Sequence, residues 1–405
     1  MRVQGRPAWL RRPSWFTCLV LVSIVSHAVL NGVRTLISYR AIALGGDAFS
    51  VGVITAAFAV LPLLVALPIG RAVDRGQGTR ALRSGLLLTV VAVALAATSD
   101  QLAVLAVASA LLGFGQILHT IACQSLIPLW SPPDSMDRRF GQLTLGVSIG
   151  QFLGFPLAGV VATLTNDTAT SGVETGPALL VFTAVAAAAV PLSFVFRPAS
   201  REKRSRRDQA ATRQSPLTIL GQRGMKPAMY SSMTVLSGLD LLTAYLPLLG
   251  DQLGLSVGVV TTLLTLRAVA SVLSRIALPV LLARVGRRPL IISATLASAV
   301  PMALVPLTTD AVALGAAMLV IGFFWGIGQP LTMVWVTAVS HRDNRASALA
   351  IRLAGNRVAQ FAVPLGAGAV AGATGVGVIF YLTGALLASS GLISWSATRA
   401  LPEEG

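Results

Sequence analysis

Twelve mostly apolar stretches run along the chain, and they limit its fold more than any other feature of the sequence. Each has roughly the 20 residues that an α-helix needs to cross a bilayer. Charged residues make up 11% of the chain, against about 25% in soluble globular proteins, so lipid has to be the solvent for most of the surface. We therefore predict an all-α integral membrane protein with transmembrane helices at residues 14–38, 50–70, 81–99, 102–125, 140–163, 177–196, 228–249, 256–282, 289–308, 311–337, 346–371 and 375–398.

The connections between these stretches differ in charge, and the difference predicts the orientation of the chain. Basic residues gather before the first stretch and in every second connection after it, whereas the other connections carry acidic residues such as Asp47, Asp100 and Asp251. Arg40 is the one clear exception. This positive-inside pattern predicts that both termini are cytoplasmic, and we expect a bacterial inner membrane. It accounts for the net charge of +16 through membrane topology and lipid contact, so we expect no nucleic-acid partner.

The sequence is duplicated. Asn31-Gly32-Val33-Arg34 and Ser50-Val51-Gly52-Val53 recur as Ser237-Gly238-Leu239-Asp240 and Ser256-Val257-Gly258-Val259, and Tyr39 corresponds to Tyr245 in the same register. Further along, Gly113 to Gln116 matches Gly326 to Gln329. The first apolar stretch has a basic start and a passable signal-peptide cleavage site, but we expect it to be retained because it has this internal twin.

The repeat predicts two six-helix halves in the same orientation, at residues 1–196 and 228–405, joined by a basic cytoplasmic linker at 197–227. Halves of this kind are related by an axis along the membrane normal, and a substrate route lies between them in transporters. We expect the chain to work as a monomer.

The loop after the second stretch carries a motif. Gly70-Arg71-Ala72-Val73-Asp74-Arg75, followed by Gly78 and Arg80, resembles the loop 2–3 signature of the major facilitator superfamily, and Ala283 to Pro289 repeats its basic part. The resemblance covers essentially the whole chain and implies alternating access. It also implies a cytoplasmic gate, although the basic residues could instead serve the positive-inside rule alone. The residues concerned are Gly70, Asp74, Arg75, Arg284, Gly286, Arg287 and Arg288.

Within that superfamily the sequence looks most like bacterial small-molecule and drug exporters, with two departures. One residue separates Gly154 from Pro156 where the exporter pattern has none. Ser109 stands where the family's arginine of the fourth segment would be, four residues before Gly113. Because that arginine is associated with proton coupling, its absence leaves both export and import open.

Charged residues inside the apolar stretches need a reason, since each costs roughly 2.5–3.5 kcal/mol at mid-membrane on insertion scales. Asp240 is the one acid in these stretches, and it can pair with Arg267 in the next helix or with Arg34 across the two halves. The first pairing is a static lock, whereas the second can break during alternating access. In either case Asp240 is the best candidate for reversible protonation.

Arginines outnumber the acid inside the membrane, because Arg34, Arg267, Arg352 and Arg357 face one aspartate. This excess favours an anionic substrate, although long arginine side chains can also reach the headgroups. Other polar residues can line a cavity or pack helices together. The candidates for a substrate cavity are Arg357, Gln116, His119, Gln329 and His27.

The sequence shows no set of residues for an enzyme, a metal or a nucleotide phosphate. We therefore expect no cofactor and predict a secondary transporter that exports a small organic molecule against inward proton flow. Uptake of an organic anion by a symporter or uniporter is the alternative, and a ligand receptor of the same fold is a lesser one.

Overall fold

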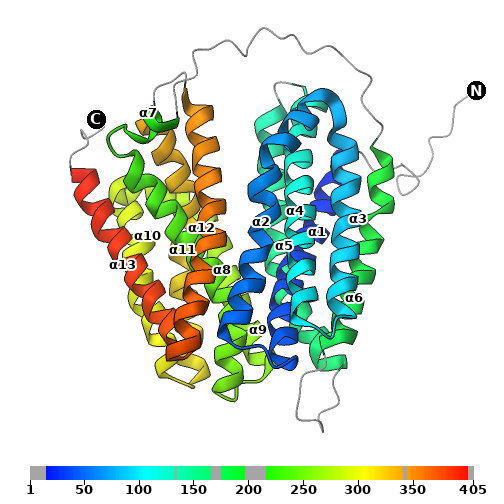
Figure 1. Ribbon diagram of the computed structural model, residues 1–405. Coiled ribbons are helices and arrows are strands. Elements are labelled where there is room, and N and C mark those ends of the chain that lie inside the picture. The colour runs from blue at the N-terminus through cyan, green and yellow to red at the C-terminus, as the bar shows by residue number, and fades with distance from the viewer. Residues whose placement is uncertain (1–14, 133–134, 166–174, 197–215, 341–343, 400–405) are drawn as a thin grey trace, which may run out of the picture.

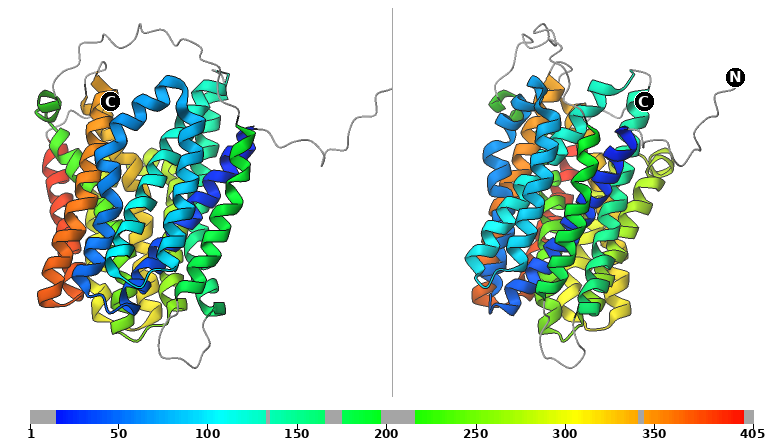
Figure 2. Two further views of the ribbon diagram at one scale, coloured as in Figure 1. Left: turned by 45° about the vertical axis from the view of Figure 1, so that its right-hand side comes forward. Right: turned by 90° about the vertical axis from the view of Figure 1, so that its right-hand side faces the viewer.

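The computed structural model describes residues 15–132, 135–165, 175–196, 216–340 and 344–399, which form helices and turns. Most of the helices run roughly along one common axis (Figures 1 and 2). The elements are α1 (Trp15–Ala43), α2 (Ala48–Ala72), a π-helical turn (Val73–Gln77), α3 (Gly78–Ala97), α4 (Leu102–Trp130), α5 (Met136–Thr165), α6 (Thr175–Ala189), a 3-10 turn (Pro191–Val195), α7 (Pro216–Leu220), α8 (Met225–Gln252), α9 (Val257–Val285), α10 (Arg287–Leu304), a second 3-10 turn (Val305–Leu307), α11 (Ala311–Val339), α12 (Arg345–Thr374) and α13 (Gly377–Arg399).

The twelve predicted transmembrane helices are present. In the described part of the chain, eleven helices are long and apolar enough to cross a membrane. The twelfth is α12, which has 30 residues but a lower hydropathy because Arg352, Asn356, Arg357 and Gln360 lie within it. The remaining helix, α7, has five residues and is too short to span. The predicted all-α membrane fold is therefore confirmed.

Helix ends differ from the predicted ends where the apolar pattern stops before the helix does. The first helix extends to Ala43, beyond the predicted residue 38, because Arg40 interrupts the hydropathy but not the backbone hydrogen bonds. It ends before Gly45, whose φ of 75° breaks a right-handed helix. Arg40 itself is fixed by Asp100, 3.2 Å away, in the turn between α3 and α4.

The helices form two bundles, α1–α6 and α8–α13 (Figure 1). In the first, α3 packs against α4 and α1 against α5; in the second, α10 packs against α13 and α9 against α11. The bundles meet mainly where α2 contacts α12 and where α5 contacts α9, with α1 and α8 between them. In the repeat, α9 is the counterpart of α2 and α12 is the counterpart of α5, so the two main contacts between the bundles are equivalent to each other.

The linker differs in part from its predicted range of 197–227. Residues 197–215 lie outside the described part, but α7 follows directly and α8 begins at Met225 rather than at 228. Ile219 of α7 is buried in a cluster that includes Met225 of α8, and α7 contacts both α8 and α12, which explains why this end of the predicted linker has helical structure.

The two bundles are closely packed at the end that carries the turns α1–α2 and α8–α9. Gly52 of α2 and Gly368 of α12 cross there, and a Cβ on Gly52 would meet the Pro364 carbonyl oxygen at 2.7 Å. The hydroxyl of Tyr245 lies 3.1 Å from the carbonyl oxygen of Ala48 and 3.3 Å from that of Pro364. At the opposite end the ribbons of α2 and α12 diverge (Figure 1).

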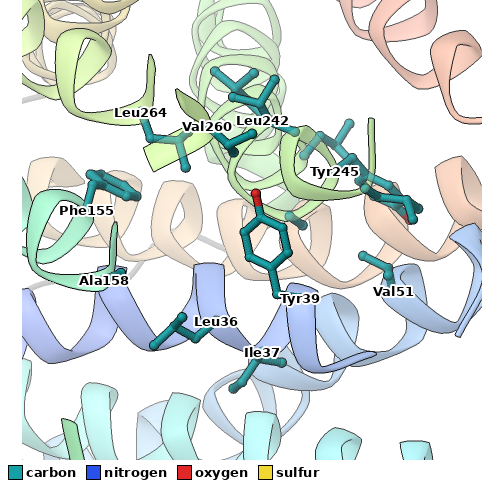
Figure 3. Close-up of a cluster of buried hydrophobic side chains, with 14 of the residues drawn as sticks. Leu36, Ile37, Tyr39, Val51, Phe155, Ala158, Leu242, Tyr245, Val260 and Leu264 are labelled. Carbon is teal, nitrogen blue, oxygen red and sulfur yellow. The ribbon is translucent and has the colours of Figure 1, made fainter. Parts of the chain in front are cut away.

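A buried apolar cluster continues across the contact between the bundles. Figure 3 shows Tyr39 of α1 pointing toward Val260 of α9 and Leu242 of α8. Phe155 of α5 and Leu264 of α9 extend the same cluster. The core at this end is therefore shared by both bundles and holds them together by excluding lipid and water.

The two loops of the predicted gate have glycines in left-handed conformations. Gly76, in the π-helical turn after α2, has a φ of 89°, and Gly286, between α9 and α10, has a φ of 82°. Such values favour glycine, since other residues are strained there. Arg284 and Arg287 are exposed and Arg288 is half-buried. The backbone at Gly70, Asp74 and Arg75 is helical, while the side chains of Asp74 and Arg75 lie outside the described set.

Candidate functional site

Asp240 and Arg34 form an ion pair that joins the two bundles. Arg34 on α1 donates from Nη1 to Oδ1 of Asp240 on α8 at 2.7 Å. Asp240 is 2% exposed, and the side chain of Arg34 is 18% exposed. The Arg34 guanidinium also lies over the ring of Phe58 on α2, 4.7 Å from its centroid. The pair is thus held inside the protein by contacts from three helices.

A second bond fixes the other carboxylate oxygen of Asp240. Gln360 on α12 donates from Nε2 to Oδ2 at 2.8 Å, and its own Oε1 accepts from Nη1 of Arg357 at 2.7 Å. The result is a polar chain from Arg34 through Asp240 and Gln360 to Arg357. Because both carboxylate oxygens accept hydrogen bonds from oriented donors, the ionised form of Asp240 is well satisfied in this arrangement.

Arg267, the other candidate partner for Asp240, contacts an aromatic ring instead of the carboxylate. Its guanidinium on α9 is placed over the ring of Phe155 on α5, 5.4 Å from the centroid. The residue is 6% exposed, and its Nε has no hydrogen-bond partner among the described residues. Of the two pairings open at the level of sequence, the structure therefore shows the one between the bundles.

Arg267 lines a cavity of about 60 Å³ between the bundles. Arg275, eight positions further along α9, lines it as well and is held by its bonds to Ser148 Oγ at 3.2 Å and to the Gly326 carbonyl oxygen at 3.3 Å. Residues of both bundles contribute to the wall. They are Asn31, Ser148, Gln151, Phe152, Val235, Leu239, Arg267, Ala268, Ser271, Val272, Arg275, Trp325 and Gln329.

Gln329 on α11 is a predicted cavity residue that does line this cavity. Its Oε1 accepts from Nη2 of Arg352 on α12 at 3.0 Å, and the same nitrogen donates to Thr332 Oγ1 at 3.0 Å. Arg352 is 6% exposed and so does not extend toward lipid headgroups, which was the alternative for it. Nε2 of Gln329 has no partner among the described residues.

Three other predicted cavity residues lie together inside the first bundle, between α1 and α4. His27 donates from Nδ1 to the Ser23 carbonyl oxygen at 2.9 Å, and its Nε2 accepts from Nε2 of Gln116 at 3.1 Å. The ring of His119 lies 5.9 Å from that of His27, with Cys123 Sγ 3.6 Å from its Nε2. All three side chains are buried, and none lines the cavity around Arg267.

Ser109, which stands in place of the family's arginine, faces the ion pair. It lines a separate cavity of about 20 Å³ together with Arg34 of α1, Thr55 of α2 and Thr243 of α8. A guanidinium on α4 at this position would enter the space that Arg34 borders from α1. The positive charge beside this cavity is therefore that of Arg34 on α1, not that of a residue at position 109 on α4.

Sequence reasoning missed Gln360 and Phe155. Gln360 follows Arg357 by three residues, so the two share a helix face, and this spacing within an apolar segment was a usable signal. Phe155 gave no signal, since a phenylalanine in an apolar stretch is ordinary. Its role depends on the crossing of α5 and α9, which sequence alone does not specify.

Comparisons with known proteins agree with the fold. The model of the Major Facilitator Superfamily matches residues 19–338 and 230–404. A point mutant of the nucleoside transporter NupG is 15% identical with a TM-score of 0.77, and the match covers 96% of this chain and 100% of that one. A search of curated proteins found no match.

Two further solved structures are similar. A D-xylose-proton symporter is 15% identical with a TM-score of 0.77, covering 96% of this chain and 99% of the other. A bacterial homolog of the human lysosomal transporter Spinster, in an inward-facing and occupied conformation, is 14% identical with a TM-score of 0.71, covering 95% and 96%. The family match, the twelve helices and the two bundles lead to one conclusion: the chain belongs to the major facilitator superfamily and is a multi-pass membrane transporter, not an enzyme.

Proposed function

We propose that the protein is a proton-coupled secondary transporter that moves a small organic molecule by alternating access, with Asp240 as the proton site. The observation that carries this proposal is the ion pair between Asp240 and Arg34, because it joins the two bundles and is buried. A buried carboxylate that can lose its partner when the bundles move is a suitable place to couple a proton to a conformational change.

The chemistry of the proposed step follows from the two bonds to Asp240. A proton on either carboxylate oxygen removes the charge that holds Arg34 and turns one acceptor into a donor. Arg34 can only donate, and Gln360 turns its NH₂ group toward the carboxylate because its oxygen accepts from Arg357, so the protonated form fits this arrangement poorly. Protonation therefore favours separation of the bundles at this level, and release of the proton favours their return.

Ser109 does not remove the basis for proton coupling. Arg34 borders the same small cavity, so a guanidinium is available beside the carboxylate although the fourth segment lacks one. We infer that Arg34 takes the part that the family resemblance gives to an arginine at position 109. This supports coupling at the ion pair from a different helix.

The conformation supports the alternating-access part of the proposal. With both termini in the cytoplasm of an inner-membrane protein, as the positive-inside pattern favours, the crossing of Gly52 and Gly368 lies on the outer side. The structure then represents a form closed to the outside. The gate proposed for the cytoplasmic side, at the two loops with Gly76 and Gly286, would close in the opposite form. We propose that a single chain suffices for this cycle.

The direction of transport has two candidates. Export against inward proton flow is implied by the resemblance to small-molecule exporters, but the drug-exporter subtype has no support among the similar structures. Symport with protons is the second candidate, and a D-xylose-proton symporter has a similar fold at 15% identity. The same ion pair serves either direction, because antiport and symport differ in which ligand each conformation binds.

The test uses purified protein in liposomes with an internal pH dye and a panel of organic anions, amines and neutral solutes. We expect solute-driven proton movement in the wild type and its loss in Asp240→Asn, which keeps the size and removes the titratable group. Asp251→Asn, the same substitution at an exposed position near the end of the same helix, should behave like the wild type. Proton and solute moving in opposite directions would indicate antiport, and movement together symport.

Unchanged proton movement in Asp240→Asn would overturn the role of Asp240. Solute flux without proton movement in the wild type would overturn proton coupling itself. Binding of a solute without any flux would instead support the receptor alternative.

A further inference from the structure

Two residues that line the cavity between the bundles each have a buried hydrogen-bond donor without a partner among the described residues. The donors are Nε of Arg267 and Nε2 of Gln329, and the cavity measures about 60 Å³. A buried polar group without a partner is costly, so each such group in a native structure needs an explanation. A ligand rich in acceptors would explain both.

The direction of the Gln329 amide follows from its neighbour. Nη2 of Arg352 lies 3.0 Å from Oε1 and 3.3 Å from the main-chain oxygen of Gln329. A guanidinium can donate but not accept, so the amide oxygen has to face Arg352. The NH₂ group is then turned away from Arg352, with its hydrogens left for a ligand.

The charges around the cavity also favour a ligand with hydrogen-bond acceptors and negative charge. Arg267 and Arg275 both line it, and none of the described residues in its wall is acidic. Arg275 already donates to Ser148 and to the Gly326 carbonyl oxygen, so it is held in place as a second positive charge. Asp240 does not serve these arginines, because its two oxygens accept from Arg34 and Gln360. Arg267 lies over the ring of Phe155 but has no acidic partner among the described residues, so its charge has no counter-ion unless an anion enters.

We propose that this cavity binds the anionic group, a carboxylate or a phosphate, of the transported molecule. The guanidinium of Arg267 and the amide of Gln329 donate to it directly, and Arg275 adds charge. The inference rests on the proposed transport function and adds the class of substrate. Planar donors of this kind suit carboxylate and phosphate oxygens.

The rest of the wall indicates an apolar body on the same molecule. Trp325 is fixed by its bond from Nε1 to Ser298 Oγ at 2.9 Å and packs against Gly238, where a Cβ would meet its ring at 3.0 Å. Phe152, Val235 and Leu239 add apolar surface. At about 60 Å³ the cavity has room for the charged group alone, because a cavity that takes a benzene ring measures about 150 Å³. The apolar body of the molecule therefore needs the cavity to widen as the bundles move, and we infer an organic anion of small size.

The experiment measures binding by calorimetry to the full chain in phosphatidylcholine nanodiscs. The probes are benzoate, phenyl phosphate, benzylamine and benzyl alcohol, which share a ring and differ in the charged group. We expect the two anions to bind and the amine and alcohol not to bind. A lipid headgroup is the other possible source of a phosphate, so the titration is repeated in nanodiscs that contain phosphatidylglycerol, where a lipid occupant would weaken benzoate binding.

Two substitutions probe the donors, and one serves as control. Gln329→Glu is nearly isosteric, keeps the acceptor for Arg352 and replaces the free donor by a negative charge. We expect it to weaken anion binding by about tenfold or more, as should Arg267→Gln. Arg345→Gln removes a positive charge from the exposed start of α12 and should leave binding within about twofold. Size-exclusion profiles and unfolding temperatures identify variants that fail to fold, and Gln329→Glu is the more conservative of the two.

The outcomes separate this inference from the proposed function. Absence of anion binding in the folded wild type, or equal binding in wild type and Gln329→Glu, would overturn the anion site but leave proton coupling at Asp240 to its own test. Anion binding without proton-coupled flux would overturn the transport proposal and keep the site. Competition by phosphatidylglycerol would assign the site to a lipid headgroup and overturn its assignment to the transported molecule.

Discussion

The two bundles carry glutamines at equivalent positions of the repeat, and the structure uses them differently. Gln116 in α4 donates to His27 and lies 3.4 Å from Thr120 Oγ1, inside the first bundle. Gln329 in α11 lines the cavity between the bundles and has a donor to spare among the described residues. A duplicated scaffold therefore places polar groups at equal depth, while the neighbours of each group decide whether it is internally satisfied or available to a ligand.

The same contrast holds at other equivalent positions. Arg34 and Asp240 carry opposite charges and bind each other across the repeat. Tyr245 contacts carbonyl oxygens of α2 and α12, whereas the hydroxyl of Tyr39 has no hydrogen-bond partner within the described part of the chain. The second copy thus supplies the polar contact at the closed end, and the first copy supplies an apolar one.

The largest effect is expected from breaking the ion pair on one side. Arg34→Leu and Asp240→Leu should each destabilise the protein by about 3–5 kcal/mol, because the first leaves the buried carboxylate and the second the largely buried guanidinium without its ion-pair partner. The double variant should cost less than the sum, since no charge then remains in the pair. Thermal unfolding in detergent measures this. Asp100→Leu, at an exposed ion pair with Arg40, should change stability by about 0–1 kcal/mol.

Strict additivity of the two leucine substitutions would contradict the pairing of Arg34 with Asp240 in the folded protein. It would indicate that Gln360 and Arg357, on the far side of the carboxylate, provide most of its stabilisation.

A smaller but more specific effect is expected from moving the positive charge to the other helix. Arg34→Ser should reduce proton-coupled flux about 100-fold, equivalent to about 2.7 kcal/mol. The double variant Arg34→Ser, Ser109→Arg restores a guanidinium at the same small cavity from α4, and we expect it to recover flux to within about tenfold of the wild type. The measurement is initial flux in liposomes. No recovery over the single variant, with the double variant folded, would show that position 109 cannot replace Arg34.

The tyrosines test the contrast at the closed end. Tyr245→Phe removes the hydroxyl that contacts Ala48 and Pro364 and should lower stability by about 1 kcal/mol. Tyr39→Phe removes a hydroxyl that has no partner among the described residues and should leave stability unchanged or raise it slightly. Unfolding temperatures of the two variants, measured side by side, decide the comparison. Equal losses would mean that the Tyr39 hydroxyl is satisfied in the protein.

The smallest effect concerns the helix starts. Asp47 precedes α2, and its Oδ1 accepts from the amide and hydroxyl of Ser50 at 2.8 and 2.7 Å. Ser256 caps α9 through its own hydroxyl, which accepts from the Val259 amide. Loss of either cap by substitution with alanine should cost about 1 kcal/mol or less at these exposed positions.

These caps differ in their dependence on pH. The hydrogen bonds from Ser50 lower the pKa of Asp47, so its contribution to stability is full above the ordinary pKa of an aspartate and is lost as pH falls through the lowered value. The difference in stability between wild type and Asp47→Ala should therefore shrink in acid, while that for Ser256→Ala stays constant. Unfolding temperatures at neutral and acid pH test this, and a constant difference for Asp47→Ala would contradict it.

Much of the fold followed from the sequence, because hydropathy and charge act along the chain. The spans, the positive-inside pattern and the repeat predicted two six-helix bundles, and the span at 346–371, which is α12, was among the predicted ones in spite of its arginines. The short helix α7 near the end of the linker was not predicted, and it forms because Ile219 is buried beside α8 and α12. Such a contact leaves no mark on a hydropathy pattern.

The sequence predicted how deep in the membrane the charged residues of the site lie, but not which of them form an ion pair. The repeat aligned Arg34 with Asp240, and Arg267 in the next helix was the other candidate partner. Which arginine binds the carboxylate depends on how α1, α8 and α9 are rotated about their axes and how they cross. Gln116, His119 and His27 were candidates for a cavity, and the structure places them within one bundle instead.

The sequence by itself determined that this chain spans the membrane in two related halves and that charges of opposite sign lie at the same depth. Both follow from periodic patterns along helices of fixed rise. The tertiary structure decided that Arg34 reaches Asp240, that Gln360 completes the carboxylate's bonds, and that Arg352 holds the oxygen of the Gln329 amide. These depend on rotation and contact between helices distant in sequence, which packing alone fixes.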